Sequence, residues 1–211
     1  MSDDVTRASR LDLPYKNLVL TGALGVGKTT IGRQIVRELG VDFFDVDEEI
    51  ELRELMSISK IRELYGDSRL KSLERDMCSR AALMRRAVVV VPGAALLDAR
   101  NFEALTDTGM VVVLTCELGE ALRRLHLASD QHYRDPTIRR RMLSRLRRER
   151  EVVFDSRLLQ LNTTHLTVEE EGKLLIRFWL TGEPEGDLFR LGPPPPYTPP
   201  GKLIVGLSRR Q

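Results

Sequence analysis

The sequence has little of what marks secreted, membrane-spanning or zinc-stabilised proteins. Only Cys78 and Cys116 are present among 211 residues, too few for a disulfide framework, and their separation fits no zinc motif. No apolar run approaches the roughly 20 residues that span a bilayer. The N-terminus also lacks a basic segment followed by an apolar one. We therefore expect a soluble cytoplasmic protein with no membrane association, whose cysteines are reduced and structural.

The net charge is small, and aromatic residues are scarce. Aromatic residues make up 5% of the chain. The formal net charge is only +2, so the overall charge gives no reason to expect a nucleic-acid partner. The histidines His126, His132 and His165 are scattered and form no ligand cluster. Hydrophobic residues reach 42%, which is enough for a sizeable core in one domain with an appendage.

Short apolar runs alternate with helical stretches through most of the chain. The run at residues 87–91 is apolar at every position, which is typical of strands in a sheet covered on both faces. Strands that alternate with helices predict a three-layer α/β domain, with a parallel sheet flanked by helices. We expect strands near residues 17–21, 42–45, 87–91, 111–114 and 159–161, and helices within residues 28–39, 48–86 (broken near Gly66), 117–156 and 167–179.

Composition divides the chain into three parts. Residues 1–15 are polar and predict an N-terminal arm, whereas residues 16–182 hold the alternating elements. Residues 183–211 are rich in proline and glycine, and the run Pro193 to Pro196 favours extended polyproline II. We expect this tail to be dispensable for the stability of the domain. The apolar residues 203–205 leave open an edge strand, a protein partner or self-association through the tail.

One segment fits the phosphate-loop motif G-x-x-x-x-G-K-[ST], between a buried strand and an amphipathic helix. In this motif, glycines let backbone N–H groups and a helix N-terminus surround phosphate oxygens. The lysine reaches the β- and γ-phosphates, and the threonine hydroxyl can ligate magnesium. The motif predicts that ATP and Mg²⁺ bind at Gly22, Gly25, Val26, Gly27, Lys28, Thr29 and Thr30.

Two aspartates follow the second predicted strand. Asp45 and Asp47 are two residues apart, so both side chains can enter one cleft where the chain leaves the sheet. A carboxylate beside a metal stays ionised, whereas its neighbour can accept a proton from an alcohol. On spacing alone, a solvated acidic turn at residues 45–49 explains the pattern equally well. The phosphate loop favours the site, because a magnesium–nucleotide site needs such a carboxylate.

From residue 17 to residue 179 these features resemble the shikimate kinase family, which has a P-loop kinase fold with a helical lid. The anchor is the segment from Phe44 to Glu51, in which Asp45, Asp47, Ile50 and Glu51 look like the D-x-D-x-x-I-E part of the family's F-x-D-x-D-x-x-I-E segment. The resemblance implies an ATP-dependent phosphotransferase of aromatic amino acid biosynthesis, which acts on a hydroxyl of shikimate or a related small acceptor. It also implies that Asp45 supports magnesium with Thr29, and that Asp47 binds the acceptor and acts as base.

The same resemblance assigns further residues. The lid would span about residues 117–156, where Arg134 is the catalytic arginine and Arg124 falls at the position of an adenine-stacking arginine. Besides Asp47, the acceptor would contact Lys71, Gly93, Ala94, Ala95 and Arg150.

This acceptor half departs from the family pattern. Lys71 stands where an arginine is expected, and lysine offers no bidentate fork to a carboxylate. A Gly-Ala-Ala turn at residues 93–95 replaces three glycines, and the lid has Arg134-Asp135-Pro136 in place of an Arg-Pro pair.

Arginines crowd the predicted lid between Arg134 and Arg150. They could close over a triphosphate, form a nucleic-acid patch or face solvent on an amphipathic helix. We expect no nucleic-acid partner, because no aromatic residues are interleaved for base stacking. Two functions stay open: a small-molecule kinase, or a sensor or regulatory module that keeps the kinase fold and ligand binding without turnover.

Overall fold

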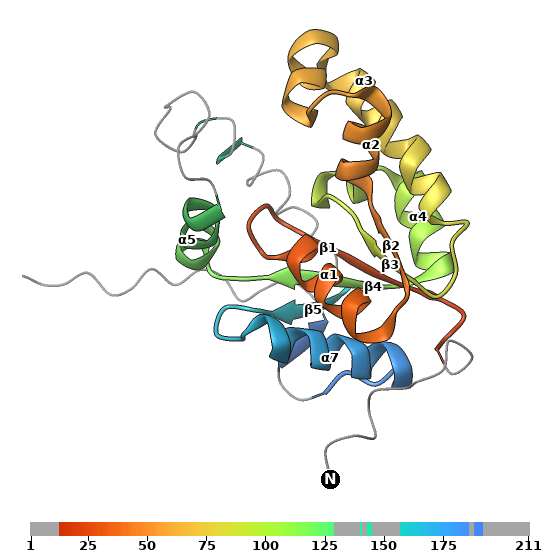
Figure 1. The fold of residues 1–211 in the computed structure, drawn as a ribbon, viewed down its shortest axis with the longest axis vertical. Helices are drawn as coiled ribbons and strands as arrows, with labels where there is room; N and C mark the ends of the chain where they lie inside the picture. Colours follow the sequence, from red (N-terminus) through yellow and green to blue (C-terminus); the bar gives the residue numbers. More distant parts are fainter. Residues whose placement is uncertain (1–12, 129–139, 141–142, 145–156, 186–187, 192–211) are drawn as a thin grey trace, which may run out of the picture.

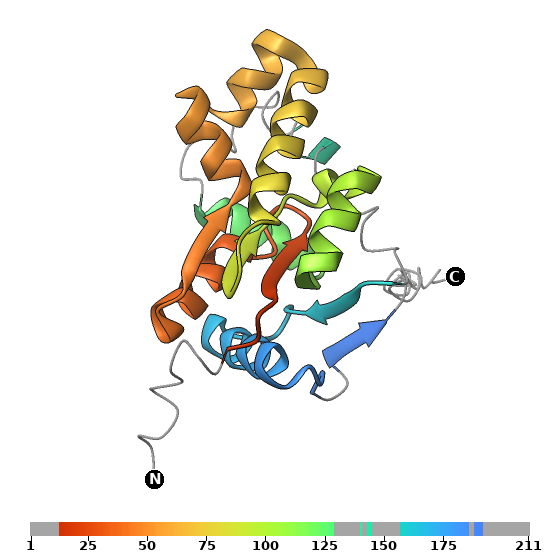
Figure 2. The same ribbon diagram turned by 90° about the vertical axis from the view of Figure 1, so that its right-hand side faces the viewer.

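The computed structural model describes residues 13–128, 140, 143–144, 157–185 and 188–191. Within these ranges one sheet carries helices on both faces, as Figure 1 and Figure 2 show. In chain order the elements are β1 (Asn17–Gly22), α1 (Lys28–Leu39), β2 (Asp42–Asp45), α2 (Val46–Glu54), α3 (Ile58–Ala81), β3 (Ala87–Val90), the 3₁₀ helix η1 (Gly93–Leu97), α4 (Ala99–Thr108), β4 (Gly109–Thr115), α5 (Leu118–Ala128), β5 (Leu159–Asn162), α7 (Val168–Thr181) and β6 (Phe189–Leu191).

The sheet of the described residues has the strand order β2-β3-β1-β4-β5-β6. In the central strand β1, Leu20 has Val90 of β3 and Val112 of β4 as its parallel neighbours. The β2–β3 and β4–β5 pairs are also parallel, whereas β5 and β6 are antiparallel. The predicted three-layer α/β fold with a mainly parallel sheet is therefore confirmed.

Successive side chains of β1 enter different cores. Leu20 packs in one core with Ile35 of α1 and Trp179 of α7. Val19 belongs to the core on the other face, with Met77 of α3. Figure 1 shows α7 on the opposite side of the sheet from α3 and α4. Strands with both faces covered need apolar side chains at every position, which is the pattern that the sequence shows.

The charged stretch predicted as one broken helix over residues 48–86 forms two helices. The first, α2, ends at Glu54 and is capped by Leu55, whose φ of 53° is left-handed. Ser57 then caps α3 by accepting a hydrogen bond from the backbone N–H of Lys60. Gly66 has φ 78° and ψ 174°, so the expected break is a kink within α3. The kink lies at glycine because this backbone conformation is strained for residues with a side chain.

The end of the domain differs from the expected boundary near residue 182. Strand β6 pairs with β5, and Phe189 lies opposite Leu161 in the antiparallel register. Phe189 is 7% exposed, and its ring centroid lies 5.5 Å from that of Phe178 in α7. Burying this aromatic side chain joins β6 to the core, so the domain includes part of the predicted tail. The apolar residues 203–205 lie outside the described residues.

The carboxyl ends of four parallel strands meet at one edge of the sheet. The phosphate loop follows β1, Asp45 ends β2, Pro92 comes shortly after β3, and α5 follows β4. In open α/β sheets, ligands bind outside this edge. None of the helices within the described ranges combines the length and apolarity needed to cross a bilayer.

Candidate active site

The phosphate loop adopts backbone conformations that favour glycine. Gly22, Gly25 and Gly27 have φ values of 132°, 85° and 97°. A Cβ atom on Gly22 would collide with the carbonyl oxygen of Leu114 in the adjacent strand β4. The loop can therefore lie close to the sheet and turn directly into α1, which begins at Lys28. The first N–H groups of a helix have no intrahelical acceptor, so this end of α1 suits an anion.

The Lys28 side chain curls back over the loop. Its ammonium Nζ donates hydrogen bonds to the carbonyl oxygens of Gly22 at 2.8 Å and Ala23 at 3.0 Å. Both acceptors are neutral, whereas hydrogen bonds to charged phosphate oxygens are stronger. The ammonium is thus held within the loop, beside the position where a nucleotide's phosphates would bind.

Asp45 links the end of β2 to the phosphate loop and to α2. Its Oδ2 accepts a hydrogen bond from the Thr29 hydroxyl at 2.8 Å. Its Oδ1 caps α2 by accepting from the backbone N–H groups of Asp47 at 3.0 Å and Glu48 at 3.4 Å. Burial raises the pKa of Asp45, and the Thr29 hydroxyl opposes that rise, whereas the neighbouring carboxylates of Asp47 and Glu48 add to it. A cation beside Asp45 would favour its ionised form.

The Thr29–Asp45 pair fits a magnesium ion of the nucleotide-bound kind. Magnesium prefers oxygen ligands, and it usually takes one or two from the protein and the rest from phosphates and water. The described part of the chain holds no group of three or more His, Cys, Asp and Glu side chains that could hold a metal ion.

A cleft of about 730 Å³ joins these groups. At one end it is lined by Asp47, Glu48 and Glu51, which all come from α2. The phosphate loop forms its middle, and α5 with the start of α7 forms the other end. Asp47 is only partly buried and follows Asp45 by two residues. Lys28, the Thr29–Asp45 pair and Asp47 therefore line the same cleft.

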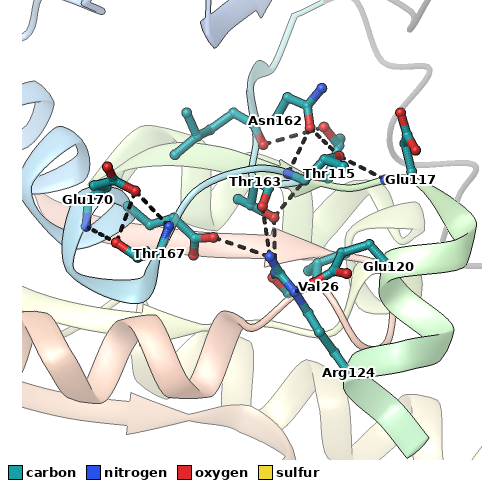
Figure 3. Close-up of polar contacts among 12 residues, drawn as sticks. Val26, Thr115, Glu117, Glu120, Arg124, Asn162, Thr163, Thr167 and Glu170 are labelled. Atoms are coloured by element: carbon teal, nitrogen blue, oxygen red, sulfur yellow. Dashed lines mark hydrogen bonds and ion pairs between the residues drawn. The ribbon is translucent and has the colours of Figure 1, made fainter.

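Arg124 of α5 ties the phosphate loop to the end of β5, as Figure 3 shows. Its Nη1 donates to the Val26 carbonyl oxygen at 3.0 Å and to the Thr163 hydroxyl at 3.2 Å. Its Nη2 donates to the Thr163 carbonyl oxygen at 2.7 Å, and its Nε donates to Glu120 at 2.8 Å. The edges of the guanidinium are thus occupied by protein acceptors, while its side chain lines the cleft.

Two carboxylates beside Arg124 have opposite electrostatic environments. Hydrogen bonds from Arg123 and Arg124 hold the pKa of Glu120 at about 2. Glu171 of α7 is 1% exposed, and burial raises its pKa to about 7 although Arg124 lowers it in part. Sequence reasoning assigned neither residue to the site. Glu171 in particular carries no distinguishing signal, because it is one of three successive glutamates in the first turn of α7.

The structure brings most of the predicted nucleotide residues together. The cleft is lined by Gly25, Gly27, Lys28, Thr29, Thr30, Asp45, Asp47 and Arg124. The carbonyl oxygens of Gly22 and Val26 face Lys28 and Arg124, respectively.

The predicted acceptor residues are placed differently. Lys71 is exposed on α3 and does not line the cleft in the described part of the chain. The cleft reaches Pro92, and Gly93, Ala94 and Ala95 follow it in η1. The lid residues Arg134 and Arg150 lie outside the described residues.

The phosphate loop and the cleft beside it are those of a P-loop kinase, and comparison with known proteins agrees. A family described as "Shikimate kinase" matches residues 24–174. A shikimate kinase of Thermodesulfovibrio yellowstonii is 29% identical over 77% of this chain and 94% of its own. One of Methylococcus capsulatus is 32% identical over 66% of this chain and 78% of its own.

A solved structure supports the fold independently. The shikimate kinase from Acinetobacter baumannii in complex with shikimate aligns with a TM-score of 0.68, 23% identity and coverage of 83% of this chain and 99% of that one. The chain therefore belongs to the shikimate kinase family. It is an ATP-dependent phosphotransferase with an alcohol acceptor, in keeping with the family that the sequence motifs resembled.

Proposed function

We propose that the protein transfers the γ-phosphoryl group of ATP to a hydroxyl of shikimate or a closely related small acceptor, with Mg²⁺ bound to the nucleotide. The observation that carries this proposal is the convergence of Lys28, the Thr29–Asp45 pair and Asp47 in one cleft. Family membership supports the same acceptor, since the relatives that match are shikimate kinases.

On the nucleotide side, the phosphates bind the loop between Gly22 and Thr30 and the N-terminus of α1. Lys28 exchanges its hydrogen bonds to carbonyl oxygens for bonds to the β- and γ-phosphates. Thr29 and Asp45 would hold Mg²⁺, whose charge would help to neutralise the phosphates. Arg124 stacks on the adenine with the face of its guanidinium, because contacts to Val26, Thr163 and Glu120 hold its edges.

On the acceptor side, Asp47 orients the attacking hydroxyl and accepts its proton. Asp47 lines this end of the cleft, where Glu48 is paired with Arg33 and Oε1 of Glu51 accepts from the backbone N–H of Ile58. The resemblance to the family assigns the acceptor's remaining groups to Lys71, the backbone near residues 93–95 and Arg150, although Lys71 lies outside the lining of the cleft in the described part of the chain. Arg134 stabilises the charge that spreads over the transferring phosphoryl group.

Lys71 offers a single ammonium charge where the family has an arginine that can make two parallel hydrogen bonds to a carboxylate, so shikimate binding should be weaker. Loss of one charge-assisted hydrogen bond costs about 1–3 kcal/mol, roughly 5- to 150-fold in affinity. We therefore expect slow phosphorylation with a high KM for shikimate, and a lower KM in Lys71→Arg. Lys60→Arg makes the same change on the same helix, at a residue paired with Glu63, and should leave KM unchanged.

Steady-state kinetics with shikimate and a panel of small polyols test the acceptor. Efficient wild-type turnover at low shikimate concentration would contradict the assignment of Lys71 to the acceptor site. ATP binding without turnover of any acceptor would favour the second candidate, a sensor or regulatory module. The exposed position of Lys71, away from the cleft, is the observation that keeps this second candidate open.

A further inference from the structure

The end of the cleft opposite Asp47 is the end that must receive the nucleobase. Phosphates held by Lys28 place the γ-phosphoryl group toward Asp45 and Asp47, so the base extends in the other direction. There the cleft is lined by Arg124, Leu166, Thr167, Val168 and Glu171. Selection of the nucleobase at this end of the cleft rests on the nucleotide site of the proposed function.

Glu171 is the one strongly buried carboxylate at this end among the described residues. Its side chain is 1% exposed, and its Oε1 lies 3.6 Å from Nη2 of Arg124. Its Oε2 is buried and has no hydrogen-bond partner. A buried acceptor without a donor is costly, by about 1–3 kcal/mol, and natural structures seldom leave one in place without a reason.

Arg124 is poorly placed to supply the missing donor. Its Nη2 already donates to the Thr163 carbonyl oxygen at 2.7 Å, and its Nη1 is shared between Val26 and Thr163. Glu120, which also faces Arg124, takes its Nε at 2.8 Å. The arginine therefore balances the charge of Glu171 without completing its hydrogen bonds. Because Oε2 makes no hydrogen bond, turning the carboxyl group toward the cleft breaks no hydrogen bond of this oxygen.

We propose that Glu171 is a specificity-determining residue, whose Oε2 accepts a hydrogen bond from the exocyclic amino group of adenine. One oxygen faces Arg124, so the carboxylate offers one free acceptor and suits a base that presents one amino group at this edge. A purine with no substituent at C6 lacks the donor, and a purine with a carbonyl oxygen there would bring two acceptors together. Stacking on Arg124 would then bind the purine ring, while the hydrogen bond to Glu171 would distinguish adenine from other purines.

The electrostatics of the pocket agree with this assignment. Burial, with Glu120 and Glu170 nearby, raises the pKa of Glu171 to about 7, against the lowering effect of Arg124. A donor to Oε2 stabilises the ionised form and lowers that pKa. The nucleotide would thus supply the hydrogen bond that the protein leaves unmade.

Direct binding of two nucleotides tests the inference without any acceptor. ATP and purine riboside triphosphate, which has hydrogen in place of the amino group, are titrated by calorimetry at pH 8, above the pKa of Glu171, into wild type, Glu171→Leu and Glu171→Gln. Wild type should prefer ATP on the order of tenfold or more, as expected for a hydrogen bond to a charged group. This preference should shrink in Glu171→Gln, which keeps a neutral acceptor, and disappear in Glu171→Leu.

A ratio of affinities separates recognition from a purely structural role. If Glu171 only positions Arg124, both nucleotides weaken equally in Glu171→Leu and the wild-type preference survives, which overturns the inference. An equal affinity of wild type for both nucleotides overturns it too. Glu169→Gln, an exposed change in the same turn, should keep the full preference. If wild type binds neither nucleotide, the proposed function itself fails together with this inference.

Discussion

Replacing Glu171 by glutamine should stabilise the protein in a pH-dependent way. The ordinary pKa of this carboxyl is 4.5, and burial raises it to about 7 in the folded state. The folded protein therefore binds a proton that the unfolded chain has already released between these two values. Stability from this group is fully present below pH 4.5, falls as the pH rises, and is lost above pH 7.

The size of the effect follows from the pKa shift. At about 1.4 kcal/mol for each pKa unit, the rise from 4.5 to about 7 corresponds to about 3 kcal/mol. Glutamine has the same shape and carries no charge at any pH. Arg124 stays anchored in the variant through Glu120, Val26 and Thr163. We expect equal stabilities of Glu171→Gln and wild type near pH 4.5, and an advantage of up to about 3 kcal/mol for the variant at pH 8.

Urea unfolding of both proteins at a series of pH values between 4.5 and 8 measures this difference. Comparing the variant with wild type cancels the titration of groups that do not interact with Glu171. Glu169→Gln is the matched control, because Glu169 is exposed in the same turn, and its difference from wild type should not grow with pH. A constant difference between Glu171→Gln and wild type across the range would show that the folded protein does not raise the pKa of Glu171.

Four further substitutions probe the site and the domain boundary. Lys28→Ala should weaken ATP binding by at least an order of magnitude in calorimetry while circular dichroism stays native, because its ammonium serves the phosphates. Asp45→Asn should raise the magnesium concentration needed for half-maximal activity. Asp47→Asn should keep ATP affinity and abolish phosphoryl transfer; equal loss of ATP affinity in both aspartate variants would contradict these separate roles. Phe189→Ala should lower the free energy of unfolding by about 3 kcal/mol, as for other buried aromatic side chains, whereas an unchanged urea midpoint would refute the packing of β6.

The nucleotide half of the site could be predicted because local sequence builds it. The conformations of Gly22, Gly25 and Gly27, and the start of α1 at Lys28, depend on residues within one short segment. Asp45 was predictable for a similar reason, since it ends a strand whose carboxyl end must lie beside the loop in a parallel sheet. Contacts of this kind follow from topology, and a sequence pattern specifies topology well.

The features that sequence reasoning missed depend on packing between distant segments. Glu171 resembles the exposed Glu169 and Glu170 in sequence, and it is buried because α7 packs against α1 at Gly172, close to Gln34. Strand β6 was missed because three residues give too short a run for alternation to be recognised, and the surrounding proline and glycine are typical of a linker.

These two classes of feature imply different tolerances to change within one active site. The phosphate loop binds through backbone N–H groups, so most substitutions outside its glycines, Lys28 and Thr29 leave its chemistry in place. In the proposed functions, side chains recognise the acceptor and the nucleobase instead: Asp47 at one end of the cleft and Glu171 at the other. A family member can therefore keep its phosphoryl-transfer machinery while its specificity changes at both ends. If Lys71 contacts the acceptor as proposed, its place at the family's arginine position is a change of this kind, because it alters the charge geometry offered to the acceptor and leaves the bonds of Lys28 and Asp45 in place.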